Sequence, residues 1–389
     1  MNKIVALLFE KILLNPVTSL KNRLFFSSVG LDLANLDGSF SKELYSFYKK
    51  MIDGDVGMVI IGNSSVSPVS KLHEKGLAIY NKTHAEALRS IISYAEMNNA
   101  LLVVQLQHYG AQGSSQQTGL PLFSPSGRHC KSMSKKYPDD KVTEMTLGNI
   151  IQVIDEFANA ATLVKEVGGK AIQIQAGNGY LLSSFLSPYT NKRSDDYGGN
   201  EENRGRLLIE VIEEIKRRTN NELMIFVRLG IDDCFDENIG LKPQHMEYIV
   251  GKLESLGVTG VECSMCIGET FHRFLRGYDE NIKKRLFDGA GLIKTFTSTM
   301  NVGCTGLVNS IQNAEYLIKK YRLDYIGMAR GLLANPNLIP EYRANIIGDS
   351  CRFDGYCFRD KSNPDLDRVY CCVNPDYLRD SKIKYGDIQ

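Results

Sequence analysis

Residues 172–206, IQIQAGNGYLLSSFLSPYTNKRSDDYGGNEENRGR, decide how the rest of the chain is interpreted. The stretch begins as a short run with β-branched residues, passes through GNGY into a long polar loop with a proline, and leads into a helical pattern at residue 207. This connection is longer than most strand-to-helix loops, and an ordered loop of such length is more often functional than idle. We therefore expect it to lie at the functional end of the fold.

Short apolar runs alternate with helical patterns along most of the chain. Near-continuous hydrophobicity is typical of strands buried on both faces, and apolar spacing by three and four is typical of helices with one buried face. The candidate strands are residues 25–28, 58–61, 101–106, 171–174, 224–229, 260–263, 301–304 and 325–328. The candidate helices are residues 41–52, 83–98, 147–167, 203–219, 243–256 and 310–321. About eight alternations of this kind close a parallel barrel.

The pattern predicts an α/β fold, namely a (β/α)8 TIM barrel over residues 9–345 with an irregular C-terminal extension over residues 346–389. An open doubly wound sheet is the alternative. That architecture would need a glycine-rich dinucleotide loop after an early strand, and no GxGxxG follows any candidate strand. In a barrel, functional side chains belong at the carboxyl ends of strands.

Composition excludes several classes of function. The formal net charge of the 389 residues is +1 and no basic run is visible, so we expect no nucleic-acid partner and no membrane association. Residues 1–14 have an apolar run cut by Glu10 and Lys11 and lack a small-residue cleavage site, which is a poor signal peptide. Nine unevenly spread cysteines predict reduced thiols in a cytoplasmic protein. The sequence leaves open whether the protein forms a homo-oligomer.

Four cysteines in the extension raise the question of a metal. Cys351 and Cys357 are separated by five residues, and the adjacent pair Cys371 and Cys372 follows after a long gap. Zinc and iron–sulfur sites use closely spaced chelating pairs. We therefore predict free thiols and no metal.

The most promising chemistry lies in GNGY. Gln175, Asn178 and Tyr180 follow a strand directly, and two amides with a phenol can hold a carbonyl oxygen and protonate an adjacent carbon. The structural alternative, about equally weighted, is that the amides shape a turn while the tyrosine packs.

Three further side chains point to a bound cofactor. Arg228 ends an apolar candidate strand. Arg330 follows the last candidate strand, and Gly306 precedes it in the chain. Two arginines at strand ends together with this glycine favour a phosphorylated cofactor over two internal salt bridges. Gln105 interrupts a buried run and could meet the amide edge of a flavin, although a glutamine bonded to backbone is more common. His108, at the same strand end, is more often structural than a ligand.

These residues resemble the old yellow enzyme family of FMN-dependent NAD(P)H oxidoreductases. The most specific part is FLSPYTNKRSDDYGGNEENRGR at residues 185–206. Weaker matches are LKNR at 20–23, DGDVGMVIIGNSSVSP at 53–68, QLQHYG at 105–110, FVRL at 226–229 and DYIGMARGLLANPNLIP at 324–340.

The resemblance implies FMN across the carboxyl mouth of the barrel, with NADPH or NADH as co-substrate. Tyr180 would be the proton donor, and Gln175 with Asn178 would grip the substrate carbonyl. Gln105 would bind the flavin pyrimidine edge and Arg228 its N1 and O2 region. The phosphate would be held by Gly306, Ala329 and Arg330. The flavin would be lined by Ser27, Ser28, Val29, Gly30 and Asn63.

The chain departs from the family pattern at three of these positions. Gln175 stands where histidine is usual, Gly30 where threonine or cysteine is usual, and Ser28 where proline is common. Cys372, in CCVNP, resembles the last cysteine of an iron–sulfur segment found in some members, but the preceding spacing differs, so we expect the extension to have lost that cluster.

We therefore expect an oxidoreductase that passes hydride from NAD(P)H through flavin N5 to an electron-poor alkene. A flavin-binding protein of low turnover with a regulatory or storage role is the alternative, because glutamine cannot carry positive charge at the carbonyl. A flavin-free barrel acting on a phosphorylated metabolite is a third, weaker hypothesis.

Overall fold

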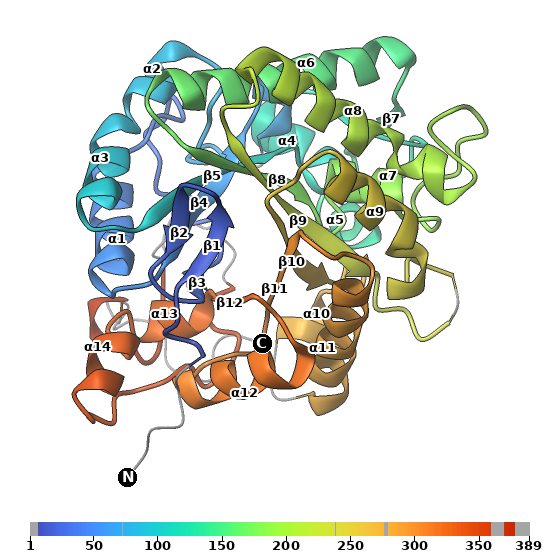
Figure 1. The fold of residues 1–389 in the computed structure, drawn as a ribbon. Helices are drawn as coiled ribbons and strands as arrows, with labels where there is room; N and C mark the ends of the chain where they lie inside the picture. Colours follow the sequence, from blue (N-terminus) through green and yellow to red (C-terminus); the bar gives the residue numbers. More distant parts are fainter. Residues whose placement is uncertain (1–6, 72, 238, 276–278, 359–368, 378–389) are drawn as a thin grey trace.

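The computed structural model describes residues 7–71, 73–237, 239–275, 279–358 and 369–377. Parts of the extension, residues 359–368 and 378–389, lie outside the described residues. A closed parallel barrel forms the centre of the molecule, and its strands surround one axis in Figure 1. Its strands, in order around the barrel, are β3 (Leu24–Phe26), β4 (Met58–Ser65), β5 (Leu101–Gln107), β8 (Ala171–Ala176), β9 (Met224–Asp232), β10 (Gly260–Met265), β11 (Asn301–Thr305) and β12 (Tyr325–Met328).

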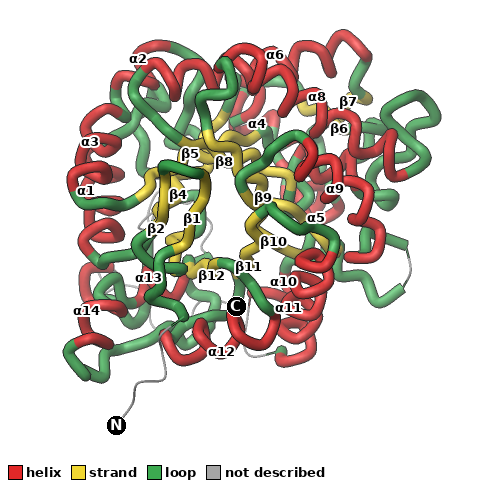
Figure 2. Tube along the Cα trace, viewed as in Figure 1, coloured by secondary structure: helices red, strands yellow, loops and turns green. Residues whose placement is uncertain are grey.

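Helices surround this barrel, as the red outer layer of Figure 2 shows. The long ones are α1 (Lys42–Asp53), α3 (Arg89–Met97), α6 (Leu147–Glu166), α8 (Glu201–Thr219), α9 (Glu247–Ser255), α11 (Glu280–Thr295) and α12 (Ile311–Tyr321). In α6 the buried residues Ile150, Val153, Phe157, Ala161 and Val164 recur every three or four positions, which is why this face packs on the strands. The alternation of strands and helices confirms the predicted TIM barrel.

The predicted elements match the observed ones closely, with three differences among the helices that surround the barrel. The helical pattern at 83–98 is two helices, α2 (Lys82–Glu86) and α3, and the pattern at 243–256 opens with the 3-10 turn η3 (Pro243–Met246) before α9. The prediction missed α11 altogether. Two glycines in that helix, Gly289 and Gly291, interrupt its apolar pattern.

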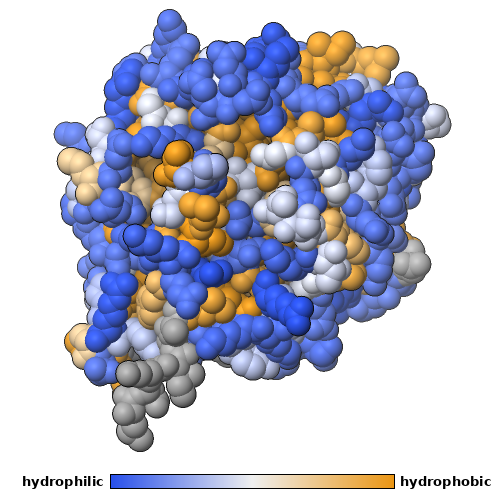
Figure 3. All heavy atoms as spheres, in the orientation of Figure 1, coloured by the Kyte–Doolittle hydropathy of each residue, from blue (hydrophilic) through white to orange (hydrophobic). Residues whose placement is uncertain are grey.

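A short antiparallel hairpin closes the amino end of the barrel. It consists of β1 (Ile12–Asn15) and β2 (Thr18–Leu20), and it lies across the front of Figure 1. Ile12, Leu14 and Leu20 pack against the inward side chains Phe25 and Phe226, so apolar side chains fill this end. Figure 3 shows this face with hydrophilic atoms around the rim and apolar patches toward the middle.

The opposite end of the barrel carries the longer connections. After β5 come η2 (Gly110–Gln112), α4 (Ser115–Thr118), β6 (Leu122–Ser124), α5 (Lys131–Lys136) and β7 (Val142–Glu144), with η1 (Pro68–Ser70) after β4. The remaining short helices are α7 (Leu181–Leu186), α10 (His272–Leu275), α13 (Arg330–Ala334), α14 (Leu338–Arg343) and η4 (Pro375–Tyr377). Within the described ranges, no helix has the length and apolar character that a bilayer crossing requires.

Candidate active site

The carboxyl ends of the barrel strands enclose a cavity of about 390 Å³, within the range of small-molecule sites. The sequence predicted thirteen site residues, and the cavity wall contains all of them except Ser27. Those that line it are Ser28, Val29, Gly30, Asn63, Gln105, Gln175, Asn178, Tyr180, Arg228, Gly306, Ala329 and Arg330. Ser27 is fully buried and lies behind this wall.

The loop after β8 turns sharply and brings its polar side chains to the cavity. Asn178 and Gly179 both have left-handed backbones, with φ of 59° and 77°, a conformation that asparagine and glycine tolerate best. Gln112 donates from its Nε2 to the Asn178 carbonyl at 2.6 Å, and Asn178 donates from its Nδ2 to the Met265 carbonyl at 3.2 Å. The loop is therefore tied to its neighbours on two sides.

Tyr180 follows this turn with its ring against Tyr109. The two rings meet edge to face, with centroids 5.0 Å apart. Burial raises the pKa of Tyr180 to about 12, although the nearby positive charge of Arg228 opposes the shift. The phenol therefore keeps its proton at neutral pH, as a proton donor must.

Gln175 and His108 occupy strand ends on either side of this loop. The Gln175 side-chain oxygen accepts a hydrogen bond from the Gly177 amide at 2.9 Å, so its Nε2 is the group left for a ligand. His108 is buried, its Nδ1 accepts from the Gly110 amide at 3.0 Å, and burial lowers its pKa to about 3. The histidine is thus a neutral structural residue.

Arg228 and Gln105 form the floor of the cavity. Arg228 Nη1 donates to the Ser27 hydroxyl and to the Ser28 carbonyl, both at 3.2 Å. The Gln105 side-chain oxygen accepts from the Ser28 hydroxyl at 2.9 Å. This approach requires Gly62, because a Cβ there would lie 2.3 Å from the Ser28 Oγ. The floor therefore presents a fixed cation beside a fixed amide.

Two buried polar atoms of the cavity walls have no hydrogen-bond partner among the residues that the structure describes. They are Arg228 Nε and Thr305 Oγ1. Unpaired buried groups cost about 1–3 kcal/mol each, and they are rare unless a ligand or water satisfies them. Their location predicts a ligand that accepts hydrogen bonds at the floor.

Arg330 lies at the far end of the cavity beside Gly306. Its guanidinium donates to the Leu275 carbonyl at 2.9 Å and to the Phe274 carbonyl at 3.3 Å. The Phe353 ring lies 5.0 Å from its central carbon. Since a guanidinium has five N–H donors, these contacts orient it and leave donors for an anion.

The extension supplies a wall of the cavity that the sequence did not predict. Phe353, Cys357, Phe358, Val369 and Tyr370 all line it. Their sequence has no periodicity that would have marked them, and the aromatic residues alone carry no such signal. The extension therefore contributes part of the cavity wall.

The cysteines of the extension lie near Arg330 and Asp354. The Cys372 thiol donates to Asp354 Oδ2 at 2.6 Å, and burial raises the pKa of Cys357 to about 12. Among the residues that the structure describes, no group of three or more histidine, cysteine or carboxylate side chains is arranged to hold a metal ion.

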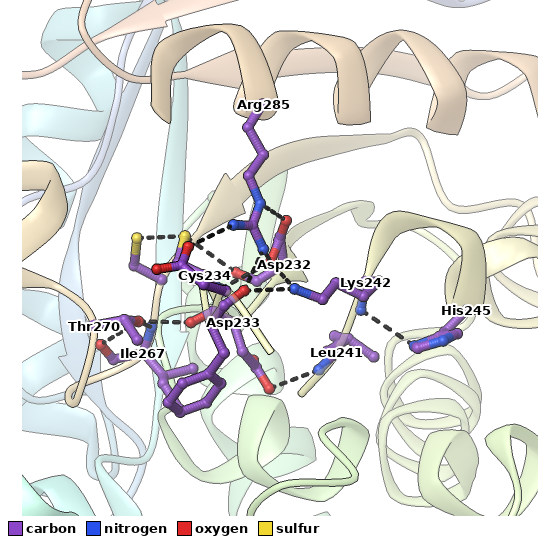
Figure 4. A network of polar contacts seen from close by, with 12 residues as sticks. Asp232, Asp233, Cys234, Leu241, Lys242, His245, Ile267, Thr270 and Arg285 are labelled. Atoms are coloured by element: carbon purple, nitrogen blue, oxygen red, sulfur yellow. Dashed lines mark hydrogen bonds and ion pairs between the residues drawn. The ribbon is translucent and has the colours of Figure 1, made fainter. Parts of the chain in front are cut away.

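A polar network behind β9 and β10 supports the part of the cavity wall that contains Gly268 and Phe271. Figure 4 shows Arg285 reaching Asp232 and Thr270 bonded to the Asp233 backbone. The Thr270 hydroxyl lies 2.6 Å from the Asp233 carbonyl oxygen. The Arg285 contacts to Asp232 are 2.5 and 2.7 Å. Because Thr270 follows Gly268 and precedes Phe271, both of which line the cavity, this network fixes the position of that wall.

Comparisons with known proteins find a matching family model and similar relatives. The model of the NADH:flavin oxidoreductase / NADH oxidase family matches residues 7–346. An NADPH dehydrogenase of Bacillus subtilis (strain 168) is 28% identical over 333 residues, which cover 85% of this chain and 92% of that protein.

Solved structures show the same fold. The old yellow enzyme homologue from Zymomonas mobilis has a TM-score of 0.73 at 20% identity, covering 88% of this chain and 94% of that one. A 2-naphthoyl-CoA reductase has a TM-score of 0.79 at 21% identity over 87% of this chain. This chain spans about half the length of that reductase, 52%.

Proposed function

Because the chain belongs to the NADH:flavin oxidoreductase / NADH oxidase family, which confirms the resemblance found in its sequence, we propose that it reduces the carbon–carbon double bond of an electron-poor alkene such as an α,β-unsaturated carbonyl compound. It is an oxidoreductase with FMN as cofactor and NADPH or NADH as co-substrate. A flavin-free barrel is thereby excluded. When bound, FMN supplies the acceptor and donor of hydride, and the protein supplies positioning and electrostatics.

The cavity has the donors that FMN requires. The unpaired Arg228 Nε suits an anionic heterocycle edge, and the free donors of Arg330 suit a phosphate. Gln105 would hold the pyrimidine edge, with Ser28, Val29, Gly30 and Asn63 along the ring. Gly306 and Ala329 would give close backbone approach to the phosphate. Ser27 would act from behind, through its contact with Arg228.

The observation that carries the proposal is that Tyr180 lines the cavity together with two amides, those of Gln175 and Asn178. Tyr180 holds a proton, and the Gln175 Nε2 with the Asn178 amide would orient a carbonyl oxygen. A carbonyl gripped in this way polarises its conjugated double bond, so hydride adds at the β carbon and Tyr180 protonates the α carbon. The hydride would come from reduced FMN, and the phenol and the two amides that the chain contributes already line the cavity.

Separate half-reactions under anaerobic conditions test the proposal. The protein with FMN is first reduced with NADPH or NADH and is then mixed with unsaturated aldehydes, ketones, cyclic enones or nitroalkenes. We expect rapid bleaching of the flavin absorbance by a nicotinamide and its return with at least one class of alkene. A flavin that reduces readily but stays reduced with every class would contradict the alkene substrate.

A flavin that stays oxidised under excess NADPH and NADH would instead favour the second candidate, a flavin-binding protein of low turnover with a regulatory or storage role. The observation behind that candidate is Gln175, whose neutral amide stabilises an oxyanion less than a protonated imidazole would. The first half-reaction therefore separates the two candidates before any alkene is added.

A further inference from the structure

A buried carboxylate lies beneath the cavity floor, on a strand that the sequence analysis did not connect with the cofactor. Glu262, in the middle of β10, is 1% exposed and does not line the cavity. Burying a carboxylate is costly unless it is paired and hydrogen-bonded. The hydrogen-bond and ion-pair partners of Glu262 therefore indicate the role of its negative charge.

Each oxygen of Glu262 reaches a different part of the floor. Oε1 accepts from the Ser27 hydroxyl at 2.6 Å and lies 3.6 Å from Arg228 Nη1. Oε2 accepts from Gln173 Nε2 at 2.8 Å. The Glu262 carboxylate thus contacts the Arg228 guanidinium directly, and it reaches the Gln105 amide through Gln173.

Gln173 connects the carboxylate to the floor amide. Its side-chain oxygen accepts from Gln105 Nε2 at 2.7 Å, and the Gln105 oxygen accepts in turn from the Ser28 hydroxyl. A carboxylate can only accept, so Gln173 must turn its NH2 toward Glu262 and its oxygen toward Gln105. Because the Gln173 oxygen can only accept, the Gln105 NH2 must face Gln173, and the Gln105 oxygen must face Ser28.

We propose that Glu262 is a positioning residue for the flavin, which fixes the orientation of the Gln105 carboxamide and balances the charge of Arg228. Without the carboxylate, the two amides could rotate by half a turn and present mixed donor and acceptor patterns to the cavity. Without its charge, Arg228 would be an uncompensated cation in the floor. An uncompensated cation favours the reduced, anionic form of a flavin above it.

The two tasks predict separate readouts. In Glu262→Gln, the midpoint potential of bound FMN should move to more positive values, and the Kd for FMN should rise about tenfold or more, as for the loss of a charged hydrogen bond. In Gln173→Met, which breaks the connection but keeps the charge, the Kd should rise while the potential stays near that of the natural protein. Glu262→Asp keeps the charge and should also keep the potential.

Glu315→Gln is the matched control. Glu315 is also a buried carboxylate, 4% exposed, but it bonds the Leu8 amide and Lys319 on the outer surface of the barrel. Its loss should cost stability and leave the flavin potential unchanged. A shift of equal size in this control would show that the effect comes from general loosening.

Potentials are measured on the FMN-bound protein by equilibration with a reference dye, and Kd by titration of flavin fluorescence. Neither readout requires an alkene, so the result stands apart from the proposed substrate. An unchanged or more negative potential in Glu262→Gln would overturn the charge role. An unchanged Kd in Gln173→Met would overturn the orientation role, and that variant tests it even if Glu262→Gln does not fold.

Discussion

Replacing Tyr180 by phenylalanine tests the role of the phenol with the least disturbance of the site. The substitution removes one hydroxyl and keeps the ring that meets Tyr109 edge to face at 5.0 Å. Because the residue is only partly buried, we expect the free energy of unfolding to change by no more than about 0.5 kcal/mol. Loss of activity in this variant would therefore be chemical in origin.

The size of the expected loss follows from what can replace the donor. The neighbouring phenol, Tyr109, accepts a hydrogen bond from Asn63 Nδ2 at 2.8 Å and does not line the cavity. It is therefore a poor substitute, and water must supply the proton. Removal of a positioned general acid costs about 100- to 10,000-fold in rate, or about 3–5 kcal/mol in activation free energy.

Anaerobic stopped-flow measurements separate the two half-reactions of the variant. Reduction by NADPH should keep its natural rate, because no proton from Tyr180 is needed, while reoxidation by an alkene should slow by the stated factor. Tyr189→Phe is the matched control, since Tyr189 lies in the same loop, packs on Phe235 at 4.5 Å and does not line the cavity. Equal slowing of both half-reactions in Tyr180→Phe would refute the proton-donor role.

The pH profile gives a second check on Tyr180. A pKa of about 12 means that the phenol stays protonated between about pH 6 and pH 9. The alkene half-reaction of the natural protein should therefore be flat over that range, because no proton is lost from the donor. A steep fall with rising pH near neutrality would assign the proton to another group.

Two further predictions concern stability. Gly251→Ala lies at an exposed position of α9 with no atom within 4 Å of the added Cβ, and it should stabilise the protein by about 0.5–1 kcal/mol. Gly289→Ala in α11 should destabilise the protein by about 1–3 kcal/mol, because its Cβ would lie 2.9 Å from Ile231 and 3.0 Å from Pro243. Urea unfolding of both variants checks these opposite signs. Burial raises the pKa of Asp233 from 3.8 to about 6, so between these values the native state binds a proton that the unfolded state has lost, and stability falls as pH rises through this window by up to about 3 kcal/mol. Asp233→Asn should flatten this part of the stability profile, and an unchanged slope would assign the pH dependence to other groups.

Much of the fold could be predicted because buried parallel strands leave a strong signal in sequence. The barrel strands are almost entirely buried, and strand-end residues such as Gln175 and Gly306 converge because the carboxyl ends of all strands meet at one end of a barrel. The sequence predicts that Arg228 ends its strand, but β9 continues to Asp232, so this arginine reaches the cavity from the middle of the strand. The convergence follows from topology alone. It needs no knowledge of the individual contacts.

The residues that the sequence analysis missed depend on contacts between distant segments. Phe353 reaches the cavity only because the extension packs beside Arg330, and no local pattern encodes that. Gln173 and Glu262 did leave a signal, since each is a polar residue inside an otherwise buried strand, as Gln105 is. Buried polar groups must find partners. Three buried polar side chains in one barrel, those of Gln105, Gln173 and Glu262, therefore favour hydrogen bonds to one another over separate hydrogen bonds to the backbone.

The strand register connects the departure at Gln175 with the carboxylate at Glu262. Arg228 pairs with Gln175 of β8 on one side and with Glu262 of β10 on the other. A histidine at position 175 would place a second group capable of positive charge beside Arg228, and repulsion between the two would lower the pKa of the histidine. With glutamine at position 175, Arg228 is the cation among these three paired residues. Glu262, on the neighbouring strand β10, balances its positive charge. If Glu262 compensates Arg228 as proposed, the charge that acts on the flavin is set from beneath the floor. A substrate carbonyl held by Gln175 and Asn178 would then meet neutral donors, and we expect its binding to be insensitive to pH.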